Sequence, residues 1–344
     1  MRSLLLFDGL GGADDALVPA LRALLRRPEN ASFRHAVCRA VDTAIEYLGP
    51  DAPADGLPLE KWLDGLDPPP LDSTAAGVCL HVHQLCGLQP VGRGDDGAVG
   101  ALGHSLGLQA AIVAGLRAVR PDEFLRLAAA SVRLVAISLV RAHQISADQI
   151  SAHQVGPRAD DVSTGPMAAV TGLTREELVR LVEGTGVVVG LVNASTAHVL
   201  SGPADALAAL RGDPAFEGSG VRWSFLPNTV PFHTPALAPV VERVRADLDA
   251  VVGPWPAPDR LALPVYAGDA PRDLRDADDL VDEYLRQVFT RPIDWPTAVV
   301  HAVDDSRATR VLDHGPGAGA RRFARERLGA RVRFEPVRRP RPTR

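Results

Sequence analysis

The pentapeptide at residues 103–107, Gly-His-Ser-Leu-Gly, places a serine between two glycines. A short apolar run at 98–102 precedes it, and a helical pattern at 108–114 follows it. A strand, a sharp turn and a helix are therefore expected, with Ser105 at the apex of the turn. The glycines permit this turn because a side chain at either position would collide with the strand or the helix. Backbone N–H groups at the helix N-terminus can stabilise an oxyanion, so we predict that Ser105 is a nucleophile.

A serine nucleophile needs a base within hydrogen-bond reach, and the chain has ten histidines. His233 is the best placed, because Pro231 and Pro235 restrict the backbone around it and a helical pattern follows. A rigidly held loop histidine suits a catalytic base. A surface histidine in a turn is the alternative, and the residues alone leave both open. His104, inside the pentapeptide, is expected to support the loop.

A second group of chemically active residues, Cys79, His81, His83 and Cys86, has the residue types of a metal site. The apolar pattern over 75–88 predicts a buried helix, however. On a helix, His81 and His83 lie about 200° apart around the axis and cannot share an ion. We therefore expect no metal here.

Composition excludes several classes of protein. The chain has 344 residues, 46% of them hydrophobic, and a net charge of −5, which argues against disorder and against general nucleic-acid binding. No apolar run approaches the length of a membrane span, and no N-terminal signal is visible, so no membrane partner is expected. The three cysteines include no C-x-x-C pair, which predicts reduced thiols in a cytoplasmic protein.

The elements that must position these residues fall into two groups. Strands alternating with helices at both ends of the chain predict a parallel α/β sheet. Residues 166–232 instead show the order β-α-β-β-α-β of a ferredoxin-like unit, with a capping box from Thr174 to Glu177. We predict an α/β-hydrolase-like core from residues 1–165 and 233–344, with a ferredoxin-like subdomain at 166–232 inserted into it.

Three remaining stretches receive simpler predictions. Residues 49–72 are rich in Pro, Gly and Asp and predict a surface excursion. Residues 143–155 predict a surface extension of a helix or a loop. Residues 336–344 predict a solvated tail or linker, whereas the arginine-rich stretch 321–333 is left open as a docking surface for an acidic partner.

The chain resembles the acyltransferase family of fatty-acid and polyketide synthases. It is most similar to the acetyltransferase domain of type I fatty acid synthases and to starter-unit acyl-carrier-protein transacylases. The matching segments follow one another in the family's order, at residues 5–12, 103–107, 190–193, 199–203, 225–234, 291–295 and 311–317. In this order, they correspond to the G-Q-G loop, the serine turn, the middle of the insert (190–193 and 199–203 together), the histidine segment, the P-V-x-W motif and the final glycine turn.

This resemblance implies a Ser105–His233 dyad that runs ping-pong acyl transfer. Ser105 would take the acyl group from an acyl-CoA and pass it to the phosphopantetheine thiol of an acyl carrier protein, with no bound cofactor. The backbone carbonyl of Arg291 would orient the histidine. The backbone N–H groups of Leu106 and Leu10 would form the oxyanion hole. Leu10 stands where the family usually has Gln, so a side-chain hydrogen bond is lost while the N–H remains.

The resemblance also bears on the acyl group. Malonyl-transferring members carry an Arg on the helix after the serine, and alignment places Ser138 or, with a one-residue slip, Ile137 at that position. An unpaired malonyl carboxylate would be costly to bury, so a short uncharged group such as acetyl is favoured. Phe232 is expected to narrow the acyl pocket. Arg141 stays a possible partner of a carboxylate if the helix register differs.

Three alternatives remain open. A malonyl-CoA transacylase would need Arg141 in the pocket. An ester or thioester hydrolase would share the serine turn but release free acid. A catalytically idle interaction domain of a synthase would form no acyl-serine, and the substitution at Leu10 allows for it.

Overall fold

The computed structural model describes residues 1–344 except 71, 91–96, 154–164, 217–219 and 338–344. Its larger part contains a five-stranded parallel sheet with the strand order β10-β9-β1-β2-β7. The strands are β1 (Ser3–Phe7), β2 (Ala98–Gly103), β7 (Val265–Tyr266), β9 (Arg310–Asp313) and β10 (Arg333–Pro336). All five residues of β1 are buried, as expected for a strand covered on both faces. The predicted parallel α/β sheet is confirmed.

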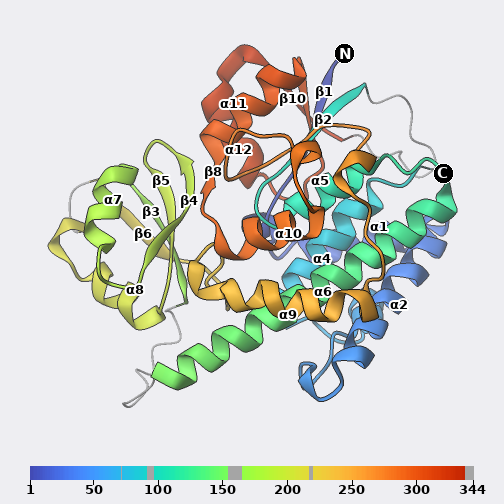
Figure 1. The fold of residues 1–344 in the computed structure, drawn as a ribbon, viewed down its shortest axis with the longest axis horizontal. Coiled ribbons are helices and arrows are strands. Elements are labelled where there is room, and N and C mark those ends of the chain that lie inside the picture. The colour runs from blue at the N-terminus through green and yellow to red at the C-terminus, as the bar shows by residue number, and fades with distance from the viewer. Residues whose placement is uncertain (71, 91–96, 154–164, 217–219, 338–344) are drawn as a thin grey trace.

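Helices surround this sheet (Figure 1). They are α1 (Leu17–Leu25), α2 (Ala31–Leu48), α3 (Leu59–Asp64), α4 (Ser73–Cys86), α5 (Gly107–Leu116), α6 (Pro121–His153), α9 (Ala238–Val251), α10 (Leu280–Leu285), α11 (Trp295–Ser306) and α12 (Gly319–Leu328). α5 contacts β1 and β2, while α4 and α6 pack outside α5. α11 and α12 pack on each other and also contact β1. α4 and α5 are buried almost from end to end, so apolar residues occupy every side of both helices.

A second sheet lies to one side of the first, on the left in Figure 1. Its order is β6-β3-β5-β4-β8, with β3 (Met167–Thr171), β4 (Val188–Ala194), β5 (Ala197–Ser201), β6 (Arg222–Phe225) and β8 (Ile293–Asp294). α7 (Arg175–Val182) and α8 (Ala204–Arg211) cover one face and share a small core with it. The capping box of Thr174 and Glu177 begins α7, as predicted.

β8 connects the two parts of the molecule. It belongs to the segment after residue 233, but it pairs in parallel with β4 of the second sheet, at Leu191 and Val192. On the same sheet, Leu191 and Val199 join the large core instead of the small one. The second sheet is therefore completed by a strand from the C-terminal third of the chain.

Several elements differ from the sequence prediction. α3 interrupts the stretch 49–72, and α2 and α11 were not predicted. α6 continues to His153, so residues 143–153 extend the helix, and 154–155 lie outside the described residues. The stretch 321–333 belongs mainly to α12, and Pro336 ends β10. The remainder of the predicted tail, 338–344, lies outside the described residues.

Within the described ranges, we find no helix whose length and apolar character would let it cross a membrane.

Candidate active site

Ser105 lies in the sharp turn between β2 and α5, with a φ of 51°. A Cβ atom on Gly103 would lie 2.2 Å from the backbone N of Leu108, and one on Gly107 would lie 2.6 Å from the carbonyl oxygen of Asp8. Both glycines are therefore required by backbone contacts. The turn places Ser105 at the C-terminal edge of the parallel sheet and at the start of α5.

The side chain of Ser105 meets His233. The Oγ atom of Ser105 lies 2.8 Å from Nε2 of His233, and Nδ1 of His233 donates to the backbone carbonyl of Arg291 at 3.1 Å. This donation leaves Nε2 as the acceptor for the serine hydroxyl. His233 is 1% exposed, and burial lowers its pKa to about 4. The imidazole is therefore neutral at physiological pH and able to accept a proton.

His233 is held from a distance. It has a φ of 62°, and the N–H of the next residue, Thr234, donates to the carbonyl of Phe289 at 3.0 Å. Phe289 lies in a π-helical turn, Arg286–Thr290, directly before Arg291. One short segment thus fixes both the backbone beside the histidine and the carbonyl that orients its ring.

The loop after β1 packs against the serine turn. A Cβ on Gly9 would lie 2.7 Å from the carbonyl oxygen of His104 and 3.1 Å from Cβ of Ser105. Among the described residues, no hydrogen bond uses the backbone N–H of Leu10 or of Leu106. Both groups are therefore available as donors, and their part in an oxyanion hole stays a prediction.

The side chain of Leu10 has an apolar environment. At Gly77 of α4, an added Cβ would lie 2.5 Å from Leu139, 3.1 Å from Leu106 and 3.6 Å from Leu10. The two residues with available N–H groups therefore meet on the same small residue of α4. Leucine at position 10 anchors the loop by packing, where the family's Gln would offer a polar group.

His104 connects the serine turn to the second sheet. Its Nε2 lies 2.9 Å from Oδ1 of Asn193 on β4. Its ring and that of Trp295 make an edge-to-face contact, with ring centroids 4.7 Å apart. Burial lowers the pKa of His104. These contacts give His104 a supporting position.

The residues proposed for the acyl pocket separate into two groups. Ile137, Ser138 and Phe232 are buried and uncharged, and the Ser138 hydroxyl lies 3.0 Å from that of Tyr284. Phe232 packs against Phe289, with ring centroids 5.8 Å apart. Whether these three contact an acyl group stays a prediction.

Arg141 requires a correction. Its Nε donates to Asp247 at 2.8 Å, its Nη2 donates to the other oxygen of Asp247 at 3.2 Å, and its Nη1 donates to Asp51 at 2.7 Å. Asp247 is on α9, so this buried arginine ties α6 to α9 and to the segment around residue 51. Two carboxylates already occupy the guanidinium, and we remove Arg141 from the acyl pocket.

The cysteine–histidine stretch lies on α4, as predicted. His81 contacts the hydroxyl of Ser131 through Nε2 at 2.8 Å, and burial lowers its pKa to about 3. In the part of the chain that the structure describes, no group of three or more His, Cys, Asp or Glu side chains is arranged to hold a metal ion. The three cysteines of the chain, Cys38, Cys79 and Cys86, are buried and form no disulfide.

Known proteins share both sequence and fold with the chain, although no family model matches it. It is 38% identical over 93 residues to the fatty acid synthase beta subunit aflB of Emericella nidulans. These 93 residues cover 27% of this chain and 4% of the relative. It is 25% identical over 327 residues to the fatty acid synthase beta subunit pigK of Monascus ruber, which covers 84% of this chain and 15% of the relative. The chain thus matches only a small part of these relatives' own length.

Solved structures share the fold. MCAT from Mycobacterium tuberculosis superposes with a TM-score of 0.69 at 20% identity, covering 98% of this chain and 96% of that chain. A type II polyketide synthase acyl-carrier protein in complex with its malonyl-transacylase gives a TM-score of 0.66 at 18% identity, covering 98% of this chain and 96% of the other. The chain resembles the acyltransferase family of fatty-acid and polyketide synthases.

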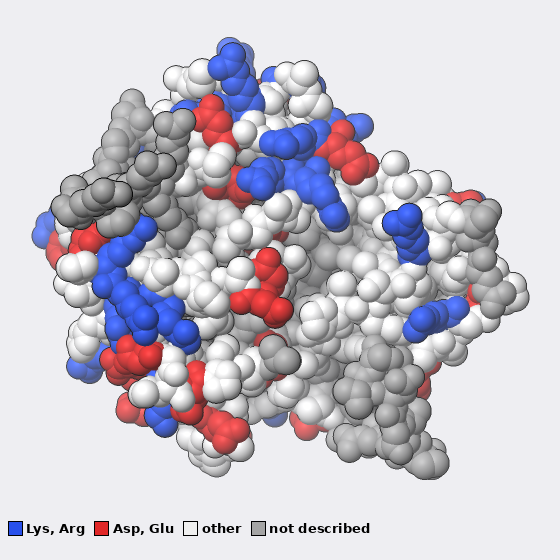
Figure 2. Space-filling view, turned by 180° about the vertical axis from the view of Figure 1, so that it is seen from behind, with Lys and Arg blue, Asp and Glu red and all other residues white. Residues whose placement is uncertain are grey.

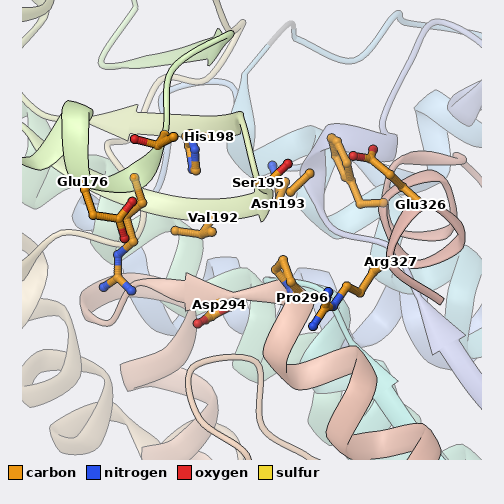
Figure 3. A pocket seen from close by; sticks show the side chains of 13 residues that line it. Glu176, Val192, Asn193, Ser195, His198, Asp294, Pro296, Glu326 and Arg327 are labelled. Carbon is orange, nitrogen blue, oxygen red and sulfur yellow. The ribbon is translucent and has the colours of Figure 1, made fainter.

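Through His104 the serine turn contacts β4 of the second sheet, and a cavity of about 610 Å³ is lined by residues of β4, α11 and α12, among others. Figure 3 shows its walls, with Asn193 in the middle, His198 on one side and Arg327 of α12 on the other. Ser105 and His233 do not line it. Asn193, however, both lines the cavity and contacts His104, the neighbour of Ser105.

Two residues around this site were not predicted from the sequence. Asn193 lay within a matching segment of the insert, but nothing marked its amide as the partner of His104. Asp8 lay within the segment matched to the G-Q-G loop. An acidic residue directly after a buried strand and before a glycine-rich loop is the signal that could have identified it.

Proposed function

We propose that the chain is an acyl-CoA:acyl-carrier-protein acyltransferase that transfers a short uncharged acyl group, such as acetyl, in fatty acid or polyketide synthesis. The observation that carries the proposal is the chain of contacts from Ser105 through His233 to the carbonyl of Arg291. The fungal synthase subunits and the transacylase structures support the same class of reaction.

In this proposal the transfer follows a ping-pong mechanism with two matching halves. Nε2 of His233 accepts the proton of the Ser105 hydroxyl while Oγ attacks the thioester carbonyl. The N–H groups of Leu10 and Leu106 stabilise the resulting oxyanion. When the tetrahedral intermediate collapses, the C–S bond breaks and His233 protonates the departing CoA thiolate. The phosphopantetheine thiol then attacks the acyl-serine by the same steps in reverse, with His233 accepting the thiol's proton.

The side chains around α6 support the proposal of an uncharged cargo. Ser138 and Tyr284 satisfy each other with hydroxyl groups, and Ile137 is apolar. Arg141, the cation nearest in sequence, is held by Asp247 and Asp51. A malonyl carboxylate placed among the uncharged residues would lack a cation, at a cost of several kcal/mol. One of the structures of similar fold is a malonyl-transacylase in complex with its acyl-carrier protein, so malonyl is the second candidate.

An acyl carrier protein is the proposed acceptor. We propose that its phosphopantetheine arm enters at the cavity lined by Asn193. Asn193 contacts His104, the neighbour of Ser105, but Ser105 and His233 do not themselves line this cavity. Beside the cavity, α12 carries the exposed arginines 322, 325 and 327. Figure 2, the view from behind, shows a group of basic side chains in the upper middle of the molecule, with acidic side chains beside and below it. Carrier proteins are generally acidic, so this charge complements the partner.

Intact-mass analysis tests the proposal. The protein is mixed with acetyl-CoA or malonyl-CoA, then with a holo carrier protein, and Ser105→Ala is the control. We expect an acetyl adduct on the parent, none on the variant, and transfer of the adduct to the carrier. A preference for malonyl-CoA overturns the cargo assignment. Free acid formed faster than acyl-carrier indicates a hydrolase, and the absence of any adduct indicates an idle domain.

A further inference from the structure

Asp8 follows the last residue of β1 and precedes the loop that carries Leu10, and it is 3% exposed. Its carboxylate accepts three backbone hydrogen bonds. Oδ1 accepts from the N–H of Gly9 at 3.0 Å and of Ala320 at 3.1 Å, and Oδ2 accepts from the N–H of Gly319 at 3.0 Å. Gly319 and Ala320 begin α12, where backbone N–H groups have no partner within the helix. One side chain therefore connects the loop to α12.

The space around this carboxylate is closed by backbone. A Cβ on Gly12 would lie 2.5 Å from Oδ2 of Asp8. A Cβ on Gly317 would lie 2.3 Å from Cα of Gly12 and 2.9 Å from the same oxygen. The glycine turn before α12 and the loop after β1 thus close over Asp8, and a shorter side chain would leave their N–H groups unpaired.

The backbone of Asp8 is held as firmly as its side chain. Its carbonyl accepts from Nε2 of Gln84 at 2.7 Å, and the same amide nitrogen reaches the carbonyl of Gly315 at 3.3 Å. Gln84 is fully buried on α4. A Cβ on Gly107 of the serine turn would lie 2.6 Å from the carbonyl oxygen of Asp8. α4, α12 and the serine turn therefore all meet at this residue.

We propose that Asp8 is a positioning residue for the oxyanion hole. Leu10 cannot supply the side-chain hydrogen bond that Gln gives to this loop in the resembling family. The carboxylate of Asp8 provides the polar anchor from the other side and fixes the peptide between Asp8 and Gly9, one residue before the Leu10 N–H. This inference rests on the proposed function. Displacing a catalytic group by about 1 Å lowers rates by roughly a hundredfold, so the anchor affects turnover directly.

The competing explanation is that Asp8 only caps α12 and stabilises the fold. The two explanations differ in what Asp8→Ala changes. Loss of a cap lowers the melting temperature but leaves the folded molecules fully active. Loss of a positioning residue lowers kcat, with little change in KM, because the oxyanion exists only during the reaction.

The test uses Asp8→Ala, Asp8→Asn and the control Asp279→Ala. Asp279 caps α10 through the N–H of Asp282 at 2.8 Å and touches neither loop nor turn. Asn at position 8 keeps one acceptor oxygen and the size of the side chain, so it separates loss of the anchor from a failure to fold. We expect kcat for acyl transfer to fall roughly tenfold to a hundredfold with Asp8→Ala, less with Asp8→Asn, and not with Asp279→Ala.

A second readout isolates the oxyanion. A trifluoromethyl ketone analogue of acetyl-CoA forms a tetrahedral adduct with serine, whereas a CoA thioether binds without one. Asp8→Ala should weaken the ketone by about the same factor as kcat, while thioether affinity stays within about twofold. Unchanged kcat per folded molecule, or equal weakening of both analogues, overturns the role of Asp8. A parent protein that forms no acyl-serine would instead overturn the proposed function.

Discussion

Ser105 and His233 both have a positive φ, 51° and 62°, although neither is a glycine. The turn of Ser105 is closed by rigid backbone, since a Cβ on Gly103 would meet Gly107 and Leu108, and a Cβ on Gly107 would meet the carbonyl of Asp8. The loop of His233 is supported by a segment more than fifty residues away, through the carbonyls of Phe289 and Arg291. Strained residues of this kind persist only where their surroundings determine them.

The two kinds of support should fail in different ways. A turn closed by rigid backbone contacts has no intermediate arrangement, so a change at a glycine removes the nucleophile altogether. A base held by a distant segment depends on how well that segment is packed, so its orientation can be loosened in steps. Substitutions in the two regions therefore test whether the difference is real.

The largest effect is expected at Gly103. In Gly103→Ala the new Cβ would meet the backbone of Gly107 and Leu108 at 2.2 Å. No flexible side chain can move aside, so we expect a loss of about 3 kcal/mol or more in the free energy of unfolding and no detectable acyl-serine. Thermal unfolding and intact-mass analysis measure both effects.

Gly212→Ala is the matched control. The nearest atom to a Cβ on Gly212 is the carbonyl oxygen of Ala209 at 3.5 Å, an ordinary contact. This variant should form the acyl adduct at the parent rate. Retention of the adduct by Gly103→Ala would show that the turn tolerates intermediate arrangements, and the comparison with His233 would lose its basis.

The serine turn and the loop of His233 also differ in how much the sequence could predict about them. The turn at 103–107 is a local pattern, and the strand before it and the helix after it were predicted from adjacent residues. The role of the Arg291 carbonyl came only through family resemblance, because no residue near His233 reveals a partner 58 positions away. The pairing of β8 with β4 was missed for a related reason, since a strand of two residues carries no periodicity.

Arg141 and α12 show two further limits. Arg141 was kept as a possible residue of the acyl pocket, and the sequence could not correct this because its partners, Asp51 and Asp247, are 90 and 106 residues away. α12 was missed because its buried face consists only of Ala320, Ala324 and Leu328, with arginines around most of the helix. These three residues have the four-residue spacing of a helix face, but two of them are alanines, so the hydrophobic pattern is weak.

A smaller, graded effect is expected at Glu283, which helps to hold the segment behind His233. Its Oε2 accepts from Nη1 of Arg291 at 3.2 Å and from Nε2 of Gln287 at 3.0 Å, and it pairs with Arg272. Burial raises the pKa of Glu283, but these hydrogen bonds and the two arginine charges outweigh it, so its pKa lies below its ordinary value. The carboxylate therefore stays charged near neutral pH.

Glu283→Gln should lower kcat about threefold to tenfold, because the Arg291 carbonyl gains freedom without being removed. Asp282→Asn is the matched control, since Asp282 is on the same helix and pairs with Arg245 but does not contact Arg291. Steady-state kinetics with saturating acyl-CoA distinguish the two. If kcat of Glu283→Gln fell as far as that of Gly103→Ala, the orientation of His233 would be lost completely and not in steps, as is expected for the serine turn.

The smallest effect is expected from a change of pH, which protonates His233 without substituting any residue. Burial lowers the pKa of His233 to about 4, so the imidazole loses its ability to accept the Ser105 proton only as the pH falls through that value. The rate of serine acylation should be unchanged between pH 7.5 and 5.5 and should fall by half near pH 4. A histidine with the ordinary pKa of about 6.5 would keep only about one tenth of its activity at pH 5.5. Single-turnover acylation at pH 5.5, with circular dichroism to confirm that the protein is folded, separates the two values.

Activity near one tenth of the value at pH 7.5 would show that the distant segment does not keep water away from His233. The loop of His233 would then open to solvent, whereas the backbone contacts of the serine turn do not allow that turn to open.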